Sequence, residues 1–523
     1  MANTTDPNLP NFQRPEAVAI KPDLDLASDL LAGTRRIWER ASPAGYLRKW
    51  KDELPEVYDI RRQCETVFEG LGRVLSACVG MLFAKAPAIV WNQSETAFLE
   101  HWQNLDGQGT AGPVLCKRFS DQSIRDGIGL ILVDHPTAPA GVVVTAANEI
   151  ALGLRPIWSL YHRAQAISWR HGIVDNALKL TQLVLHECSR EGAGTYGTVD
   201  VNRYRVLRLL PDPAGGRVAT WELFEETKDT GVGGFKSVGT GVFRNRSGVA
   251  SEILPVAIAH TGRTDAPLCA TIPLLGVAWA NLSHWRLSTA LTFAREVASY
   301  AQGVVVGQLE SSGTAANGAA IPGRVKLGPL ALIHLVGENA SFEWKAPPVE
   351  AFAPLERGIT EKLQQIGQMG MSFMVTDTRA AETAAAKELD ATAENSTLAT
   401  SAQAIQDAWN LGMELHAWYL GIEKAGAPVM TINKDFNAVV LEAATMSVYV
   451  QAVSQAGLPV RLLLEAWQKG GRIPEDTDLD ELEAEMLVNE QAAADAEAQA
   501  AQDAHANNLA IVKAKVDPAK AAA

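Results

Sequence analysis

The spacing of hydrophobic residues predicts a long helix in the middle of the chain, followed by an insert and a second helix. Residues 276–302 place apolar and small residues three and four positions apart, which is the period of a helix. Glycine, proline and short β-like runs interrupt this period over residues 303–353. Helical periodicity returns at 354–374, and a third long helical pattern covers about 396–421. We therefore expect two long helices that flank a β-containing insert.

The apolar stripes of these helices contain many small residues, which allow neighbouring helices to approach closely. The stripes comprise, in chain order, Leu287, Leu291, Ala294, Ala298 and Ala301; Ile359, Leu363, Ile366, Gly370 and Phe373; and Leu398, Ala402, Ile405, Ala408, Gly412, Leu415 and Tyr419. We expect close helix contacts, either inside one subunit or between subunits. Within the insert, residues 331–336 and 341–346 are predicted to pair as a hairpin across residues 337–340.

The first half of the chain combines both periods. Residues 25–83 and 114–126 follow the helical period, and residues 88–91 fit a strand. The apolar run at 130–136 is short enough to be a buried strand. From 155 to 260 the period changes to two, with glycine, proline or aspartate turns between most runs. These patterns predict an α+β fold in which an antiparallel sheet packs on the preceding helices.

The two ends of the chain are polar. Residues 1–24 contain several prolines and no signal-peptide pattern, so we expect an extended N-terminal arm. A returning strand is predicted at 429–436, and helices over 440–470. Beyond Pro474 the chain is acidic and rich in alanine, which predicts a solvated helix and a frayed tail.

Size and charge restrict the possible functions. The chain has 523 residues, of which 47% are hydrophobic and 20% charged, enough for two or three cores. No run approaches the roughly 18 consecutive apolar residues of a membrane span. The formal net charge is -14, whereas tight non-specific DNA binding relies on clustered Lys and Arg. This acidity suits a surface along which DNA slides without being held.

Residues that could carry chemistry are few. Asp134 and His135 follow the predicted buried strand, where α/β enzymes place reactive groups. An Asx-type turn is the favoured interpretation, and an α+β enzyme with a site near Asp134 and His135 is the alternative. His284 and His416 are expected to be core or interface residues, because no second ligand lies three or four positions away. The glycines of 231–241 lack the P-loop spacing and are interpreted as a hairpin tip.

The cysteines give no sign of a metal site or a disulfide framework. They are scattered along the chain at Cys64, Cys78, Cys116, Cys188 and Cys269. We expect buried, reduced thiols in a protein made in a reducing compartment. Taken together, the residues predict no enzyme activity, no cofactor and no metal.

The order of these features resembles the portal proteins of tailed bacteriophages, and more narrowly a portal-like family long catalogued as a domain of unknown function. The resemblance covers about residues 25–440 and rests on order and spacing. The matching segments are DLLAGT (29–34), VGMLFAKAP (79–87), DGIGLILVDHP (126–136), RPIWSLYHRAQAISWRHG (155–172), LVLHE (183–187), YRVLRLL (204–210) and PLLGVAWANLSHWRLSTALTF (273–293).

The resemblance implies a portal architecture. Its parts would be an N-terminal arm (1–24), a wing (25–275), stem helices (276–302 and 354–374), a β-containing clip (303–353), a tunnel-loop region (375–395), a channel helix with a return to the wing (396–440), a helical crown (441–490) and an acidic C-terminal tail (491–523). By its own pattern, the 375–395 region is expected to be part helix and part loop.

The resemblance also implies a role in the virion, after synthesis in the host cytoplasm. Portal subunits form a ring, usually of twelve copies, at one capsid vertex, in contact with capsid and scaffolding proteins. A terminase motor drives double-stranded DNA through the ring without sequence specificity, and the clip docks the motor and later a head–tail adaptor. DNA-facing candidates in the tunnel-loop region are Thr376, Asp377, Thr378, Arg379 and Lys387. An ordinary surface position is an equal alternative for each, because the ring geometry decides which residues face the channel.

Overall fold

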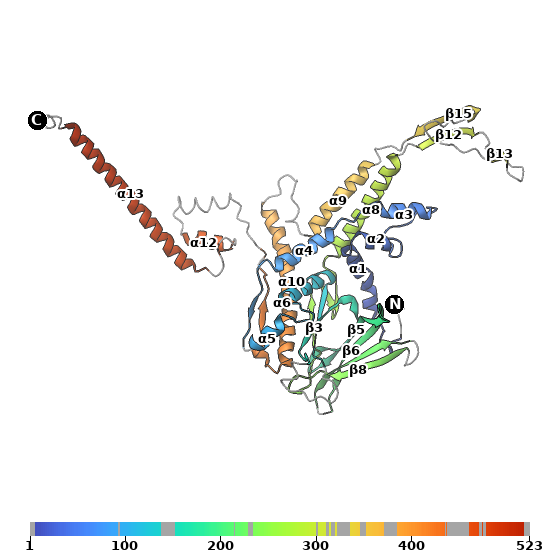
Figure 1. Cartoon of the computed structure of the whole chain (residues 1–523), viewed down its shortest axis with the longest axis horizontal. Coiled ribbons are helices and arrows are strands. Elements are labelled where there is room, and N and C mark those ends of the chain that lie inside the picture. The colour runs from blue at the N-terminus through green and yellow to red at the C-terminus, as the bar shows by residue number, and fades with distance from the viewer. Residues whose placement is uncertain are drawn as a thin grey trace. The chain divides into compact units, whose positions relative to one another are not determined.

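The computed structural model shows a mixed helix and sheet protein (Figure 1). It describes residues 6–92, 95–136, 152–213, 215–227, 234–299, 302–309, 313–314, 320–321, 335–345, 352–370, 384–434, 436, 460–469, 473 and 477–516. The chain divides into two compact units, residues 1–434 and residues 435–523, which are described separately below.

A three-stranded antiparallel sheet forms the centre of the first unit. Strand β2 (Ile128–Asp134) lies between β3 (Ile157–His162) and β9 (Val256–His260). Residues 128–133 are buried, because α6 (Gly112–Asp126) and α10 (Ala384–Tyr419) pack against this sheet. The predicted buried strand is therefore confirmed, and so is the long third helix.

A second, five-stranded antiparallel sheet follows the order of the chain. Its strands are β4 (Ala166–Val174), β5 (Ala177–Ala193), β6 (Gly197–Pro211), β7 (Arg217–Glu226) and β8 (Phe235–Val242). Asp175 and Asn176 join β4 to β5 with φ angles of 53° and 60°, as a two-residue type I′ turn requires. Residues 155–260 are rich in strands as predicted, but they contribute to two sheets rather than one because β3 and β9 pair with β2.

The remaining elements of the first unit are mostly helices. They are α1 (Pro15–Leu31), α2 (Thr34–Arg40), α3 (Pro55–Gln63), α4 (Gly70–Leu82), α5 (Glu95–Trp102), α8 (Leu275–Ser299), α9 (Phe352–Gly370), the 3-10 turns η1 (Arg163–Gln165) and η4 (Lys424–Gly426), and the short strands β10 (Thr264–Ala266), β11 (Cys269–Ala270), β13 (Gly313–Thr314) and β14 (Ala320–Ile321). Strands β1 (Ala88–Val90) and β16 (Val429–Thr431) pair with each other, which confirms both predicted strands.

The prediction of an extended arm over residues 1–24 is wrong from Pro15 onward. Helix α1 begins at Pro15, where a proline is tolerated because the first helical N–H needs no partner within the helix. Arg14 before it is extended, with φ -64° and ψ 145°. Only residues 6–14 of the described N-terminal part are therefore non-helical.

The predicted hairpin of residues 331–336 and 341–346 is also wrong where it can be followed, since residues 331–334 and 346 lie outside the described part of the chain. Residues 335–345 form one strand, β15 (Leu335–Lys345), which pairs with β12 (Gln302–Leu309). The register shifts between Val306, opposite Ser341, and Gln308, opposite Val336. Residues 337–340 thus form a bulge in a continuous strand rather than a turn.

Half of the glycine-rich segment 231–241 belongs to a strand. Gly239 and Gly241 lie in β8, while residues 231–233 fall outside the described chain. A Cβ atom on Gly241 would approach the Trp221 ring to 2.8 Å, and one on Gly239 would approach it to 3.2 Å. Glycine is needed in β8 because the indole of Trp221 lies against the backbone of this strand, so the hairpin-tip interpretation is corrected here.

Three tryptophans anchor the core, whereas the cysteines differ in burial. Trp158, Trp285 and Trp409 are buried. Cys78 and Cys116 are buried, Cys64 and Cys269 are intermediate, and Cys188 is exposed on β5. The prediction of buried thiols is therefore right for two of the five.

The second unit contains α12 (Val460–Lys469) and α13 (Leu479–Val516). Leu464 of α12 is buried, and Arg461 forms ion pairs with Asp480 and Glu465. Helix α13 confirms the predicted acidic, alanine-rich helix, and it extends to Val516, into the residues expected to be frayed. Most of the described side chains of α13 are exposed, as expected for a solvated helix.

We predict that Gly129→Ala destabilises the first unit by about 3 kcal/mol, because overpacking a tight core forces side chains out of place. A Cβ at Gly129 would lie 1.9 Å from Ser123 Oγ and 2.7 Å from the Phe119 ring of α6. Urea unfolding followed by tryptophan fluorescence measures the loss.

The matched control is Gly80→Ala on the exposed face of α4, where no atom lies within 4 Å of the added methyl. This change should stabilise by about 0.5–1 kcal/mol, since alanine favours helix. Equal unfolding midpoints for the two variants would contradict the packing described here.

Candidate functional site

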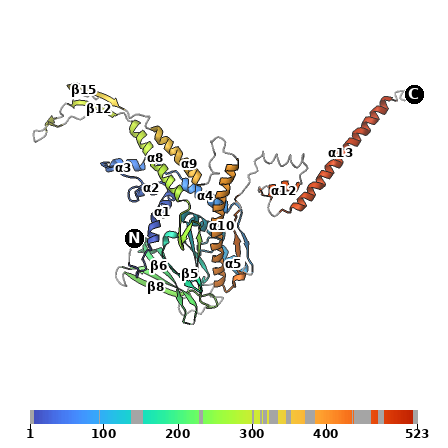
Figure 2. The same cartoon turned by 180° about the vertical axis from the view of Figure 1, so that it is seen from behind.

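The candidate functional site is the helix pair α8 and α9 with the strands between them, because the functional prediction rests on this order of helix, insert and helix. The two helices lie side by side and carry β12 and β15 beyond their far ends (Figures 1 and 2). Helix α8 ends at Ser299 and β12 begins at Gln302; β15 ends at Lys345 and α9 begins at Phe352. The predicted order of helix, β insert and helix is therefore confirmed.

Small residues let α8 and α9 approach each other. A Cβ on Gly358 would lie 3.3 Å from Leu287, and a Cβ on Gly276 would lie 3.2 Å from the Met369 sulfur. Arg295 and Glu356 form an ion pair near the far end. Close packing of the two helices is therefore confirmed, although only Leu287 of these contact residues belongs to a predicted stripe.

The stripe of α9 is only partly buried. Ile366 is 5% exposed, but Leu363 is 40% exposed and Met369 is 48% exposed. Trp279 on α8 is 44% exposed as well. Apolar side chains therefore remain on the outer surface of the helix pair.

Asn281 fixes the N-terminal part of α8, here called its base, to the rest of the first unit, here called the body. Its Oδ1 accepts a hydrogen bond from the Leu71 N–H at 3.0 Å, and its Nδ2 donates to the Phe68 carbonyl at 2.9 Å. Asn281 is 1% exposed, so both backbone groups would be buried without a partner if the amide were absent. A Cβ on Gly70 would lie 2.6 Å from Asn281 Oδ1, which explains the glycine at the start of α4.

Glu65 connects the same base to a second helix. Its carbonyl accepts hydrogen bonds from Trp38 Nε1 at 3.0 Å and Trp285 Nε1 at 3.2 Å. Its carboxylate accepts one from Thr292 Oγ1 at 2.7 Å. Helix α8 is therefore held at two points roughly three turns apart, while residues 295–297 beyond them are exposed.

The DNA-facing candidates are only partly described. Thr376, Asp377, Thr378 and Arg379 lie outside the described residues. Lys387 belongs to α10, which begins at Ala384, so residues 384–395 supply the helical part expected of the 375–395 region.

Asp134 and His135 are brought together, but their polar atoms are engaged in structural contacts. Asp134 Oδ1 accepts from the His135 N–H at 2.8 Å, and Oδ2 accepts from Arg205 Nη1 at 3.1 Å. Burial raises the pKa of Asp134. His135 Nδ1 lies 2.9 Å from the Pro136 carbonyl, and its ring stacks on Tyr419 with centroids 5.7 Å apart. The expected Asx-type turn is wrong, because it needs the N–H two residues after Asp134 and Pro136 has none; the carboxylate accepts from the next residue instead.

Arg205 makes this cluster a junction between the two sheets. Besides Asp134 on β2, it pairs with Glu187 on β5 at 2.6 Å. Glu187 also accepts a 2.6 Å hydrogen bond from the Tyr161 hydroxyl of β3. The arrangement joins β2, β3, β5 and β6, and it gives the carboxylates of Asp134 and Glu187 structural partners.

His416 is a core histidine as predicted, and its partner is a second histidine. Trp158 Nε1 donates to His416 Nδ1 at 3.0 Å, so the His416 proton lies on Nε2, which faces His101 Nδ1 at 3.0 Å. The His416 ring also packs on Phe98, with centroids 4.4 Å apart. This chain of hydrogen bonds joins α5, β3 and α10.

Both histidines must be neutral for these bonds to form. A proton on either ring places two N–H groups against each other somewhere along the chain, because Trp158 can only donate. Burial lowers the pKa of His416, and the positive charge of Arg155 nearby adds to this effect. The hydrogen bonds among Trp158, His416 and His101 are therefore sensitive to acid.

Two other kinds of feature, a metal site and a membrane-spanning helix, are absent from the described residues. No group of three or more His, Cys, Asp or Glu residues there is placed to hold a metal ion. Within the same residues, every helix is too short or too polar to cross a membrane.

Comparisons with known proteins cover the same block. A family model described as a domain of unknown function (DUF4055) matches residues 273–420, which include α8, α9 and α10. No curated protein matches the sequence. Among solved structures, a chain of the virion of a native gene transfer agent particle is 12% identical with a TM-score of 0.36, over 82% of this chain and 98% of that chain. A chain from the neck of an empty gene transfer agent particle is 11% identical with a TM-score of 0.34, over 80% of this chain and 93% of that chain.

We predict that Asn281→Ala destabilises the first unit by about 2–4 kcal/mol, because it leaves a buried N–H and a buried carbonyl without partners. Ser283→Ala is the control on the same helix, since the Ser283 hydroxyl only bonds back to the Trp279 carbonyl of α8. Its effect should stay within about 0.5 kcal/mol. Urea midpoints that coincide for the two variants would show that Asn281 does not fix the helix.

We also predict that the first unit loses stability in acid through His416. Its folded-state pKa is lowered, so the unfolded chain takes up the proton first as the pH falls. The contribution is fully present above about pH 6.5 and is lost below it, by about 1.4 kcal/mol per pH unit.

His416→Gln retains hydrogen-bonding atoms but cannot titrate. Between about pH 7 and pH 5 the unfolding free energy of this variant should therefore fall less steeply with pH, and the difference in slope should correspond to the uptake of at most about one proton on unfolding. His505→Gln, on the exposed surface of α13, should keep the slope of the parent chain. Three identical slopes would contradict the role assigned to His416.

Proposed function

We propose that this chain is a portal subunit: several copies form a ring at one vertex of a tailed-phage capsid, and double-stranded DNA passes through the ring during packaging and ejection. Twelve is the expected number of copies. The ring would be a passive channel, with a terminase motor supplying the force and a head–tail adaptor binding afterwards.

The observation that carries the proposal is the anchored helix pair with its strand insert. Asn281 and Glu65 fix the base of α8 to an α+β body, as the wall of a channel requires. The pair continues beyond the body into β12 and β15, which pair only with each other among the described strands. Two-stranded sheets are marginally stable alone, so contact with a neighbouring copy or a docked protein would stabilise the insert.

The outer surface of the helix pair supports a contact between copies. Leu363 and Met369 of α9 and Trp279 and Val297 of α8 are between 36% and 48% exposed in the single chain. Burial of such side chains gains free energy in proportion to the apolar area removed from water. In a ring, each copy would present this surface to the next.

The charge of the chain supports a channel that does not hold DNA. The formal net charge of -14 provides no excess of cations to neutralise phosphates. Thr376, Asp377, Thr378, Arg379 and Lys387 would face the DNA in this proposal, with β12 and β15 docking the motor and adaptor.

The test is the mass of the assembled particle by mass photometry, with the full chain purified alone and together with capsid and scaffolding proteins. We expect a ring of about twelve copies of the 56.1 kDa chain. Monomers under both conditions would overturn the proposal.

Leu363→Glu should reduce the ring fraction at least about tenfold, because it places a charge in the contact between copies. Gln364→Glu, the neighbouring exposed position, adds the same charge beside this surface and should have little effect. Both side chains are exposed in the single chain, so neither change should lower its unfolding midpoint. Equal ring fractions would exclude this face of α9 from the contact.

A further inference from the structure

Residues 6–14, here called the N-terminal strap, lie across one face of the five-stranded sheet. The strap ends at Arg14, whose N–H donates to the Ile167 carbonyl at 2.9 Å. The Arg14 guanidinium donates to the Trp169 carbonyl at 2.8 Å and lies over the Trp169 ring, 5.2 Å from its centroid. These contacts hold one end of the strap on β4.

Leu9 holds the other end. It packs on a buried cluster that comprises Ile167, Val184, Tyr204, Val206 and Phe235. This cluster draws on four of the five strands, so the strap covers an apolar patch in the middle of the sheet face. Without the strap, that patch would be open to water.

The strap fills its groove incompletely. A cavity of about 510 Å³ remains between strap residues, such as Leu9 and Phe12, and side chains from all five strands. The Asn11 Oδ1 atom is buried without a hydrogen-bond partner, which costs free energy.

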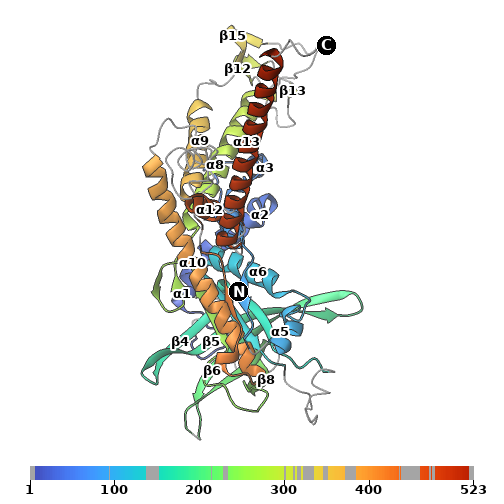
Figure 3. The same cartoon turned by 90° about the vertical axis from the view of Figure 1, so that its left-hand side faces the viewer.

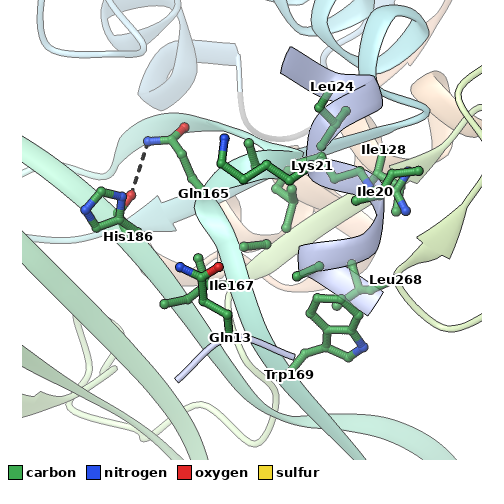
Figure 4. A pocket seen from close by; sticks show the side chains of 15 residues that line it. Gln13, Ile20, Lys21, Leu24, Ile128, Gln165, Ile167, Trp169, His186 and Leu268 are labelled. Carbon is green, nitrogen blue, oxygen red and sulfur yellow. Dashed lines mark hydrogen bonds between the residues drawn. The ribbon is translucent and has the colours of Figure 1, made fainter. Parts of the chain in front are cut away.

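Poor filling continues under the following helix. A further cavity of about 200 Å³ lies beneath α1, and Gln13, Ile20, Ile167 and Trp169 are among the residues that line it (Figure 4). The N-terminal segment is therefore seated on the body with gaps on both sides of Arg14.

We propose that this groove is a binding site for an extended peptide and that its second occupant is the N-terminal strap of another copy of this chain. The strap has no helix or strand of its own and joins α1 at Pro15, so it can leave the groove without unfolding any element. A second copy carries the same Leu9 and Arg14 and makes the same contacts. Exchange of an identical segment between copies is a low-cost route to association.

The proposal goes beyond the ring, because strap exchange requires only two copies in contact. It also explains why the strap combines one apolar anchor and one backbone-directed arginine with an unfilled cavity. A segment that docks in the groove of either copy needs a few specific contacts, and the rest of the groove has to accept small differences in its position.

The test is photo-cross-linking in the full chain with p-benzoylphenylalanine in place of Leu9. The cavity leaves room for the larger side chain, and Phe12, which also lines it, offers a second, aromatic position for the same probe. Unlabelled and ¹⁵N-labelled chains are mixed before assembly, and cross-linked peptides are identified by mass spectrometry. Replacement of Tyr196, 98% exposed at the end of the β5–β6 hairpin, is the control.

Exchange predicts cross-links from position 9 or 12 to groove residues such as Val184 and Val206, with about half of the intermolecular pairs joining one labelled and one unlabelled chain. Arg14→Ala should lower the yield at both positions at least about tenfold, since it removes two contacts. Same-isotope pairs alone, or cross-links outside the groove, overturn the proposal.

The outcome is independent of the mass measurement. If a ring forms but only same-isotope pairs are found, the portal proposal stands and the proposed strap exchange is wrong. Mixed-isotope pairs in dimers that never close into a ring would do the reverse.

Discussion

The amide of Asn281 is the interaction on which the arrangement of the first unit depends most. Two long helices that leave a body need a fixed base, and non-directional apolar packing alone allows them to rotate or slide. The Asn281 amide supplies direction, because its donor and acceptor each have one buried backbone partner at the start of α4. Glu65 adds a second fixed point further along α8. Together these bonds hold the part of α8 between Asn281 and Thr292 against the elements before it.

The elements that the sequence predicts correctly are those whose signal is local. The helical period over α8, α9 and α10 and the apolar run of β2 each lie within a single element. The insert shows where such reasoning fails. Residues 337–340 look like a turn, but the partner strand lies about thirty residues earlier, and pairing with β12 turns the signal into a bulge. Likewise, the glycines of β8 are explained only by the position of Trp221 on the adjacent strand.

The polar contacts of the candidate site were the least predictable part. His101 and His416 are 315 residues apart, and no spacing in the sequence relates them to each other or to Trp158. What the sequence could indicate was that a lone histidine among apolar residues belongs to the core, which is right. Asp134 shows the converse: its place after a buried strand suggests chemistry, and only Arg205 and Glu187, from the other sheet, show that it serves structure.

The distribution of fixed and loosely held parts is consistent across the first unit. The centre is held by directional bonds between distant elements, as at Asn281, Arg205 and His416. The outer parts lack equivalent contacts: the helix pair keeps apolar side chains exposed, β12 and β15 pair only with each other among the described strands, and the strap leaves a cavity beneath it. A monomer that functions alone gains nothing from apolar surface left in water. The exposed apolar side chains of the helix pair and the incompletely filled groove under the strap are the places at which the proposed contacts with other copies would form.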